Sequence, residues 1–536
     1  MPEIFIGEYL FRRLKEIGID TIFGVPGDYE LALLDQVEPQ GLSWIGTPNE
    51  LIGAYAADGY ARIKGAGAPV TTFGPGELSA LCGIGGSFCE NVPIVHIVGH
   101  YERMSSEISC ATAVLRDTAT AASEIDRVLN AMLYHSKPGY IGISEDVAYS
   151  KVSIEYLNTP LTKTLAPSAP EPAARAVAEI IKTLESAKAP ILMVDGGAAR
   201  GDWAPHVNSL IEALKIPFFQ TMIGKGIANE ESPYYHGSYG GAGSWPPNVQ
   251  STVESADCIL WLGDYPSDFN TGIFSEDLSG ITIIDLQRFH VKIGETTYDA
   301  RINHILPQLI SAFESHAPLH QLSLAPLSPI AFPSSPPKTI QHDWFWDRLS
   351  SFIQPTDLVI TETGTCQAGI NVTRFPAGAQ GWTQGIYGSI GYAASATAGA
   401  SIASLETGKF KRVVLVTGEG SLQLKVQALS LINRLGAPAV VLVLNNKGYT
   451  IERFFRGWTA GYNDVPMWDY GALAKAFSPE IDGVRTYKVG TGDELDRLLG
   501  DDEFATAQVA RVVDMLMEVD DAPTGIFEVK RKVVSA

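Results

Sequence analysis

The sequence predicts an α/β protein with three doubly wound parallel-sheet domains in series. Three observations predict this fold class. Apolar runs rich in β-branched residues, such as 413–416 and 440–444, are typical of strands buried on both faces of a parallel sheet. Segments of helical length separate such runs, as parallel βαβ units require. The 52 glycines suit the many tight turns between these strands and helices.

Residues 1–165 form the first expected domain, because short apolar runs and helical segments alternate along them. A Gly-Val-Pro-Gly turn follows its first strand, and an Ala-rich helical segment follows its second. The expected helices are 6–17, a segment that starts at Tyr29, and 49–64. The expected strands are 21–23, 42–45, 69–73, 92–98 and 140–143.

The same alternation predicts a central domain at 170–318. Its expected helices are 173–187 and 203–214, and its expected strands are 190–194, 259–262 and 281–285. A stretch rich in Pro and Ala precedes this domain, and a Pro- and Ser-rich linker at 319–339 follows it. Residues 340–536 form the last expected domain.

The composition excludes several classes of partner. A net charge of −21 argues against nucleic acid and anionic membrane surfaces. The five cysteines are scattered without a CxxC pair, which is typical of reduced thiols and predicts a cytoplasmic protein. The first residues lack the basic region and apolar core of a secretory signal, and no apolar stretch is long enough to span a bilayer.

Polar residues follow two neighbouring apolar runs of the last domain. Gly418-Glu419-Gly420-Ser421 follows one run, Asn445-Asn446 follows the next, and a helix is expected between them at 422–435. Because parallel strands end at the same edge of a sheet, Glu419 and Asn446 are expected side by side as oxygen ligands. Ser421 and the first amides of the helix suit a phosphate. Either motif alone is also compatible with an ordinary turn or strand exit.

Together the two motifs resemble the metal–diphosphate motif of thiamine diphosphate enzymes. The run from Gly448 to Glu452 is similar to that of the pyruvate and indolepyruvate decarboxylase family. The resemblance covers essentially the whole chain and implies the thiamine diphosphate-binding fold, with thiamine diphosphate and Mg²⁺ as cofactors. Glu419 stands where the family has Asp, and its extra methylene shifts the carboxylate. The implied metal ligands are Glu419, Asn446 and Gly448, and the implied cofactor contacts here are Glu419, Gly420, Ser421, Asn446, Gly448, Tyr449, Thr450 and Ile451.

Glu50 is the first catalytic residue that the resemblance implies. A glutamate in the first turn of a helix ordinarily compensates the helix dipole. Asn49-Glu50-Leu51 and the helix that follows resemble the family's activating-glutamate motif. There, a carboxyl in a dry pocket protonates a pyrimidine nitrogen of the cofactor, which leads to the thiazolium ylid. Similar motifs imply further cofactor contacts through Thr72, Thr365, Gly388, Ser389 and Ile390, the last as a wedge under the bent cofactor.

Asp28 and Glu452 are the acids expected to act on the substrate. An aspartate before a helix, such as Asp28, is ordinarily a cap. In the family, the residue that matches Asp28 transfers a proton or helps the aldehyde to leave. The residue that matches Glu452 orients the substrate carboxylate and handles protons during loss of carbon dioxide. Two carboxyls near one reacting carbon titrate as a coupled pair, as acid–base catalysis requires.

Three departures from the family pattern affect the prediction. No adjacent histidine pair occurs in the chain; His100 is a candidate for its role, with an ordinary loop histidine as the alternative. Segment 194–200 has no cysteine where some relatives have a substrate-sensing thiol, so we expect no thiol-mediated activation. Ala368 stands where pyruvate-specific relatives often have an aromatic residue, and Phe454 and Phe455 offer aromatic lining. Indolepyruvate and phenylpyruvate are therefore expected substrates beside pyruvate.

The resemblance implies non-oxidative decarboxylation of a 2-oxo acid to an aldehyde and carbon dioxide. It also implies a homodimer or homotetramer with active sites at the dimer interface. Two alternatives stay open. An acetolactate-type carboligase would share Glu50 and the metal motif, and a non-catalytic paralogue would bind the cofactor but lack the histidine-pair loop.

Overall fold

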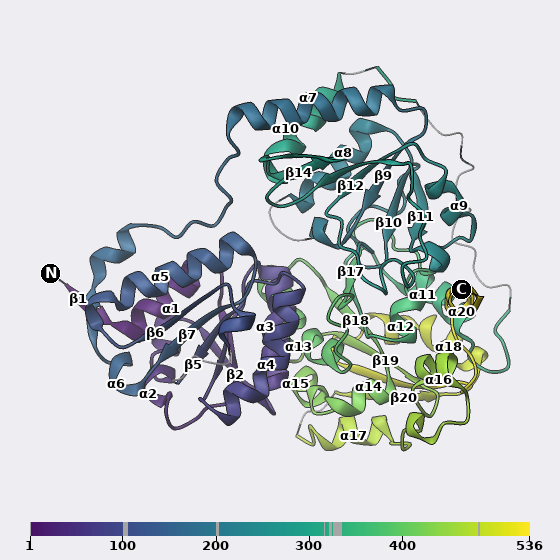
Figure 1. The fold of residues 1–536 in the computed structure, drawn as a ribbon. Coiled ribbons are helices and arrows are strands. Elements are labelled where there is room, and N and C mark those ends of the chain that lie inside the picture. The colour runs from purple at the N-terminus through teal and green to yellow at the C-terminus, as the bar shows by residue number, and fades with distance from the viewer. Residues whose placement is uncertain are drawn as a thin grey trace.

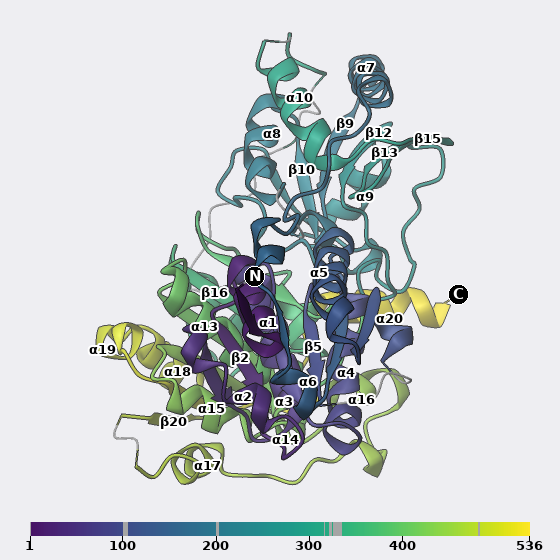
Figure 2. The same ribbon diagram turned by 90° about the vertical axis from the view of Figure 1, so that its left-hand side faces the viewer.

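The computed structural model describes residues 2–99, 105–199, 203–315, 317–320, 324, 335–480 and 483–535. His100 lies outside these residues. The chain forms three α/β units, each on its own large sheet (Figure 1). The N-terminal and C-terminal units lie side by side, and the central unit lies above them (Figure 2).

The N-terminal sheet has six parallel strands in the order β3-β2-β4-β5-β7-β6. Strand β7 is buried along its whole length, because helices cover both faces of the sheet. The strands are β1 (Glu3–Phe5), β2 (Thr21–Gly24), β3 (Ser43–Gly46), β4 (Pro69–Thr71), β5 (Val95–Val98), β6 (Ala111–Leu115), β7 (Gly139–Ile143) and β8 (Lys151–Ser153), with β1 and β8 paired separately. The helices are α1 (Ile6–Glu16), α2 (Leu31–Leu34), η1 (Glu38–Gln40), α3 (Glu50–Lys64), α4 (Pro75–Cys89), η2 (Ser106–Ile108), α5 (Thr118–His135), α6 (Glu145–Ala148) and η3 (Ile154–Asn158).

The central sheet has the order β11-β10-β9-β12-β13-β14-β15, and its last two strands are antiparallel. This edge hairpin is not predicted from the sequence, since strands of three residues carry too little periodicity. The strands are β9 (Pro190–Val194), β10 (Phe218–Thr221), β11 (Tyr235–Tyr239), β12 (Cys258–Leu262), β13 (Thr282–Leu286), β14 (Val291–Ile293) and β15 (Thr296–Tyr298). The helices are α7 (Pro170–Ser186), η4 (Gly196–Ala199), η5 (Ala204–His206), α8 (Val207–Leu214), η6 (Gly241–Gly243), α9 (Asn248–Glu254) and α10 (Ile302–Glu314).

The C-terminal sheet is parallel throughout, in the order β17-β16-β18-β19-β21-β20. The strands are β16 (Asp357–Thr361), β17 (Gln380–Thr383), β18 (Arg412–Gly418), β19 (Ala439–Asn445), β20 (Arg485–Val489) and β21 (Arg511–Leu516). The helices are α11 (His342–Phe352), α12 (Thr365–Gly369), α13 (Tyr392–Thr407), α14 (Glu419–Leu424), α15 (Ala428–Arg434), α16 (Thr450–Arg456), η7 (Gly461–Asn463), α17 (Tyr470–Ala476), α18 (Gly492–Leu499), α19 (Asp502–Thr506) and α20 (Thr524–Ser535).

Two expected helices differ in the structure. The single helix expected at 422–435 is two helices, because α14 lies over the ends of β18 and β19 whereas α15 packs on α13 and α17. The helix expected from Tyr29 is only the single turn α2. The Tyr29 ring instead makes an edge contact with Phe73, at 4.7 Å between ring centroids. Tertiary neighbours therefore decide both helix boundaries.

Helices α3 and α13 join the N-terminal and C-terminal units through small residues. A Cβ atom at Gly59 would lie 2.2 Å from the carbonyl oxygen of Ala396. A Cβ atom at Gly399 would lie 1.8 Å from the carbonyl oxygen of Ala56. The two backbones thus approach more closely than any larger side chain would allow.

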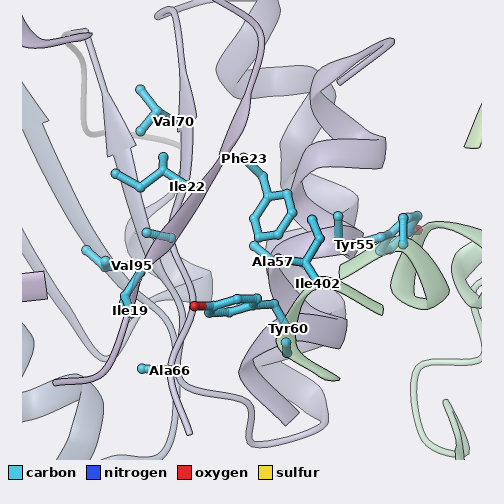
Figure 3. Packing of buried hydrophobic residues seen from close by; sticks show 14 of the residues in the cluster. Ile19, Ile22, Phe23, Tyr55, Ala57, Tyr60, Ala66, Val70, Val95 and Ile402 are labelled. Atoms are coloured by element: carbon cyan, nitrogen blue, oxygen red, sulfur yellow. The ribbon is translucent and has the colours of Figure 1, made fainter. Parts of the chain in front are cut away.

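One hydrophobic core runs through both of these units. Tyr60 and Ala57 of α3 pack near Phe23 of β2, and Ile402 of α13 lies beside them (Figure 3). The start of α3 is therefore held in place relative to the segment that leads into α13. Within the described ranges, none of the helices has the length and apolar character needed to cross a bilayer.

Candidate active site

The ends of β18 and β19 gather the residues expected to bind metal and diphosphate. The strands pair in parallel, with Gly418 opposite Leu444. Glu419 begins α14, and its Oε1 accepts a 2.6 Å hydrogen bond from the backbone N–H of Gly448. Gly448 has a φ of +150°, and a Cβ atom there would lie 2.3 Å from the carbonyl oxygen of Asn463. Only glycine fits this turn, which brings the 446–448 segment against the Glu419 carboxylate.

The electrostatics of Glu419 suit a cation. Its side chain is buried, and burial raises the pKa of the carboxyl to about 7, while hydrogen bonds from backbone amides, including that of Gly448, oppose the shift. A bound divalent cation would favour the charged carboxylate. Mg²⁺ prefers a few protein oxygens together with phosphate oxygens. Glu419, Asn446 and the backbone of Gly448 offer such oxygens, so this edge fits Mg²⁺ and a diphosphate.

The segment from Gly388 to Gly391 lies next to this edge. Both glycines have positive φ values, +62° and +88°. A Cβ atom at Gly391 would lie 3.1 Å from the carbonyl oxygen of Ser421, so the segment runs close to α14. Ile390 is 36% exposed although it is apolar. An exposed isoleucine beside the diphosphate edge is consistent with a wedge under a bound cofactor.

Tyr55 is a site residue that sequence reasoning missed. Its hydroxyl lies 2.5 Å from Oγ of Ser389 and 3.3 Å from Sγ of Cys82. Tyr55 stands on α3, the helix that begins with Glu50. The contact ties the helix that begins with Glu50 to the segment of Gly388, Ser389 and Ile390, which is expected to contact the cofactor. No sequence motif contains this pair, because the two residues are 334 positions apart.

Glu362 is a second residue whose role is visible only in the structure. It follows β16, is buried, and accepts hydrogen bonds from the backbone N–H groups of Thr363 and Ala393, at 3.1 and 3.3 Å. Burial raises the pKa of its carboxyl to about 7. The bond to Ala393 anchors the first turn of α13, and thereby the segment that carries Ile390.

The N-terminal unit carries a separate group of acids. Glu50 is the first residue of α3, and the Asn49 side chain caps this helix by accepting a 2.9 Å bond from the N–H of Ile52. Cγ2 of Thr72 and Oε1 of Glu50 lie 3.0 and 3.2 Å from the position that a Cβ atom at Gly76 would take. The side chains of Glu50 and Thr72 therefore adjoin.

Asp28 lies in the turn after β2 and is exposed. The expectation that Asp28 caps a helix is wrong, because α2 begins at Leu31 without any side-chain cap. Burial, together with the charges of Asp28 and Glu50, raises the pKa of nearby Glu30 to about 7, while hydrogen bonds from Gly27 and Thr72 oppose the shift. Glu30 was not predicted as a site residue, although it follows Asp28 by two positions.

A cavity of about 210 Å³ lies between the C-terminal unit, the central unit and α20. Ala368, Glu452 and Phe455 line it from the C-terminal unit. Phe269 of the central unit and Ile526 of α20 form part of the opposite wall. Phe454 points elsewhere: it packs in a small core with Ile526 rather than in the cavity lining. The lining is mostly apolar and includes the acids Asp268 and Glu452, which suits a 2-oxo acid with an apolar substituent.

Within one chain, the expected residues form groups on different units. Asp28, Glu50 and Thr72 lie on the N-terminal unit, and the metal and diphosphate residues lie on the C-terminal unit with Glu452. Thr365 begins α12, after the turn at Gly364, whose φ is +108°. Gly364 lines the cavity, so Thr365 directly follows a residue of the cavity wall.

Thiol-blocking reagents are expected to leave the shape of the substrate saturation curve unchanged. At Gly197, in segment 194–200, a Cβ atom would lie 2.6 Å from the carbonyl oxygen of Gly263, so no side chain fits there. Of the five cysteines, Cys258 and Cys366 are buried, and none is paired. Initial rates against pyruvate, measured before and after alkylation, test this. A sigmoidal curve that alkylation makes hyperbolic would contradict it.

Family models match three parts of the chain. Residues 5–121 match the N-terminal TPP binding domain of thiamine pyrophosphate enzymes, residues 177–308 match the central domain, and residues 362–512 match the C-terminal TPP binding domain. Thiamine pyrophosphate is thiamine diphosphate under its other name. The three matches follow the order of the three α/β units.

Full-length relatives carry one name. The chain is 39% identical to a pyruvate decarboxylase of Candida glabrata, over 98% of each chain. It is 38% identical to pyruvate decarboxylase isozyme 1 of Saccharomyces cerevisiae, again over 98% of each chain. It is 39% identical to a pyruvate decarboxylase of Aspergillus terreus, over 97% of this chain and 95% of the relative.

Proposed function

Because the chain belongs to the thiamine diphosphate-dependent pyruvate decarboxylase family, we propose that it converts a 2-oxo acid to an aldehyde and carbon dioxide without oxidation. The observation that carries the proposal is the edge at β18 and β19, where the buried Glu419 carboxylate meets the N–H of Gly448. This edge lies beside a cavity that contains Glu452. The proposed cofactor site and the carboxyl of Glu452 thus both adjoin a cavity that could hold the substrate.

Thiamine diphosphate, when bound, supplies the nucleophilic carbon and the electron sink. We assign a proton-transfer role at its pyrimidine nitrogen to Glu50, and roles at the reacting carbon to Asp28 and Glu452. The proposed metal ligands are Glu419, Asn446 and Gly448. The other proposed cofactor contacts are Thr72, Thr365, Gly388, Ser389, Ile390, Gly420, Ser421, Tyr449, Thr450 and Ile451.

We further propose a homodimer or homotetramer in which the acids of one subunit complete the diphosphate site of its partner. The location of the two groups on two different units of the chain, each of which can contribute to a shared site, is the basis of this proposal. The five unpaired cysteines support a cytoplasmic location. In functional terms, 1–165 is the pyrimidine-binding domain, 170–318 the central domain, 319–339 a linker and 340–536 the diphosphate- and metal-binding domain.

Carbon dioxide release from pyruvate, phenylpyruvate and indolepyruvate, with thiamine diphosphate and Mg²⁺ supplied, tests the proposed function. Release of carbon dioxide with formation of the matching aldehyde supports it. Acyloin as the main product would indicate a carboligase instead. Tight cofactor binding with no release from any of the three acids would indicate the non-catalytic paralogue.

Enlarging Ala368 to phenylalanine is expected to narrow the substrate range. The small side chain lines the cavity beside Glu452, and a phenyl ring there would occupy space that an indole or phenyl substituent needs. We expect kcat/KM for indolepyruvate to fall by about 10- to 100-fold, while the value for pyruvate changes by less than about threefold. The same substitution at exposed Ala174 of α7 is the control. Equal losses for both substrates would contradict the prediction.

A further inference from the structure

Glu30 is a buried carboxyl that the assignments above leave unused. Its side chain is 1% exposed, and its Oε1 accepts a 3.0 Å hydrogen bond from the backbone N–H of Gly27. Its Oε2 is also buried, and no hydrogen-bond partner for it occurs among the residues that the structure describes. A buried polar atom without a partner is costly and rare in folded proteins. Among the described residues, this oxygen is therefore available to a partner during the reaction.

The position of Glu30 places its side chain, through Oε1, beside residues assigned to the reaction. Thr72 Oγ1 and Glu30 Oε1 each lie 2.9 Å from the position that a Cβ atom at Gly27 would take. Thr72 also adjoins Glu50, so this threonine neighbours both Glu30 and Glu50. Oε2 faces the end of β5, where a Cβ atom at Gly99 would lie 2.9 Å from it.

The charged groups that act on Glu30 are also acids. Asp28 acts from the turn after β2, and Glu50 acts from the start of α3. Thr72 and the Gly27 amide are its hydrogen-bonding neighbours, and Gly99 at the end of β5 has no side chain. Burial and the two acids together favour the protonated form of Glu30 near neutral pH. A proton can therefore reside on Glu30 near neutral pH.

The reaction needs such a proton. Conversion of a 2-oxo acid anion to an aldehyde and carbon dioxide consumes one proton in each turnover. The chain has no adjacent histidine pair to supply it. We propose that Glu30 is the proton relay of this active site, with the unpartnered Oε2 as the atom that carries the proton.

In this relay, a proton leaves Glu30 and travels through water to the Asp28 carboxylate, so that one O–H bond breaks on Glu30 as another forms on Asp28, and Asp28 passes the proton to the reacting carbon. Water then returns a proton to Glu30. Glu30 acts through Asp28 and touches neither substrate nor cofactor, so it is a positioning residue. The inference rests on the proposed function.

Glu30→Gln is the variant that tests the relay, and Glu38→Gln, an exposed glutamate on the same unit, is its matched control. The relay donates from its protonated form, so kcat of the unmodified enzyme is expected to fall as pH rises through about 7. This fall is the alkaline limb of the pH profile of kcat. Glu30→Gln should lose this limb, with kcat lowered about tenfold at pH 6 and KM unchanged. Glu38→Gln should retain both the rate and the limb.

A second readout needs no cofactor. The pKa of Glu30 is raised from 4.5 to about 7, so the folded state binds an extra proton between these values and loses stability as pH rises through them. Thermal unfolding of the cofactor-free protein should show Glu30→Gln to be more stable than the unmodified chain at pH 8. The difference should vanish below about pH 4.5.

The outcomes separate the two proposals. If the unmodified enzyme releases carbon dioxide and Glu30→Gln keeps the same rate and limb, the relay is overturned and the proposed function stands. If the unmodified enzyme decarboxylates no 2-oxo acid, both are overturned. Should Glu30→Gln fail to fold, Glu30→Asp retains a carboxyl and is expected to keep the limb. A missing limb in folded Glu30→Asp would also overturn the relay.

Discussion

Replacing Glu50 with glutamine is expected to abolish 2-oxo acid decarboxylation, with kcat lowered by about 10²- to 10⁴-fold. Glutamine keeps the size of the side chain but cannot hold and return a proton at the pyrimidine nitrogen. Glu50 is the acidic residue in the first turn of α3. Carbon dioxide release under saturating cofactor and Mg²⁺ measures the loss.

Cofactor binding separates this effect from misfolding. Because the diphosphate and metal residues lie on the C-terminal unit, Glu50→Gln should bind thiamine diphosphate with an affinity within about tenfold of the unmodified chain. Calorimetric titration provides the measurement. Glu38→Gln, on the same unit but exposed, should show unchanged turnover. Retained turnover in Glu50→Gln would contradict the proposed role in proton transfer.

Replacing Glu419 with alanine is expected to remove Mg²⁺-dependent binding of thiamine diphosphate, with a loss of affinity of at least about 100-fold. Two effects contribute to this loss of affinity. The variant loses the only carboxylate among the proposed metal ligands, and the backbone N–H of Gly448 loses its 2.6 Å acceptor. The turn that holds Asn446 is then less well ordered. Calorimetric titration of the cofactor with and without Mg²⁺ measures the effect.

Glu419→Asp is the matched variant, because it keeps a carboxylate but draws it back by one methylene. It should recover most of the cofactor affinity, since short and long carboxylates both serve as oxygen ligands. Thermal unfolding of the cofactor-free proteins checks that both variants are folded. Mg²⁺-dependent binding in Glu419→Ala equal to that of the unmodified chain would remove Glu419 from the metal site.

The C-terminal edge could be predicted because its residues are local in sequence. Glu419 and Asn446 each follow a strand directly, and neighbouring parallel strands end at one edge, so pairing of β18 with β19 brings the 446–448 segment to Glu419. The break that divides the helical segment between these strands into α14 and α15 could not be predicted from its sequence. Its break near Lys425 depends on α13 and α17, which come from other parts of the chain.

Other parts of the site have no local signal at all. Tyr55 meets Ser389 only because glycines let α3 and α13 approach closely. The cavity that contains Glu452 needs α20 and the central unit to close it. Glu30 looks like an ordinary charged residue after Asp28, and only its burial without a partner for Oε2 marks it.

By itself, the sequence determined the α/β class, the family, the cofactor and the identity of the residues at strand ends. These follow from hydrophobic periodicity and from short motifs whose geometry a parallel sheet dictates. Tertiary structure alone decided how α3 docks on α13, which walls enclose the cavity, and that Glu30 Oε2 is buried with no hydrogen bond among the described residues. Those features depend on close packing between segments hundreds of residues apart, and packing leaves no periodic trace in a single chain.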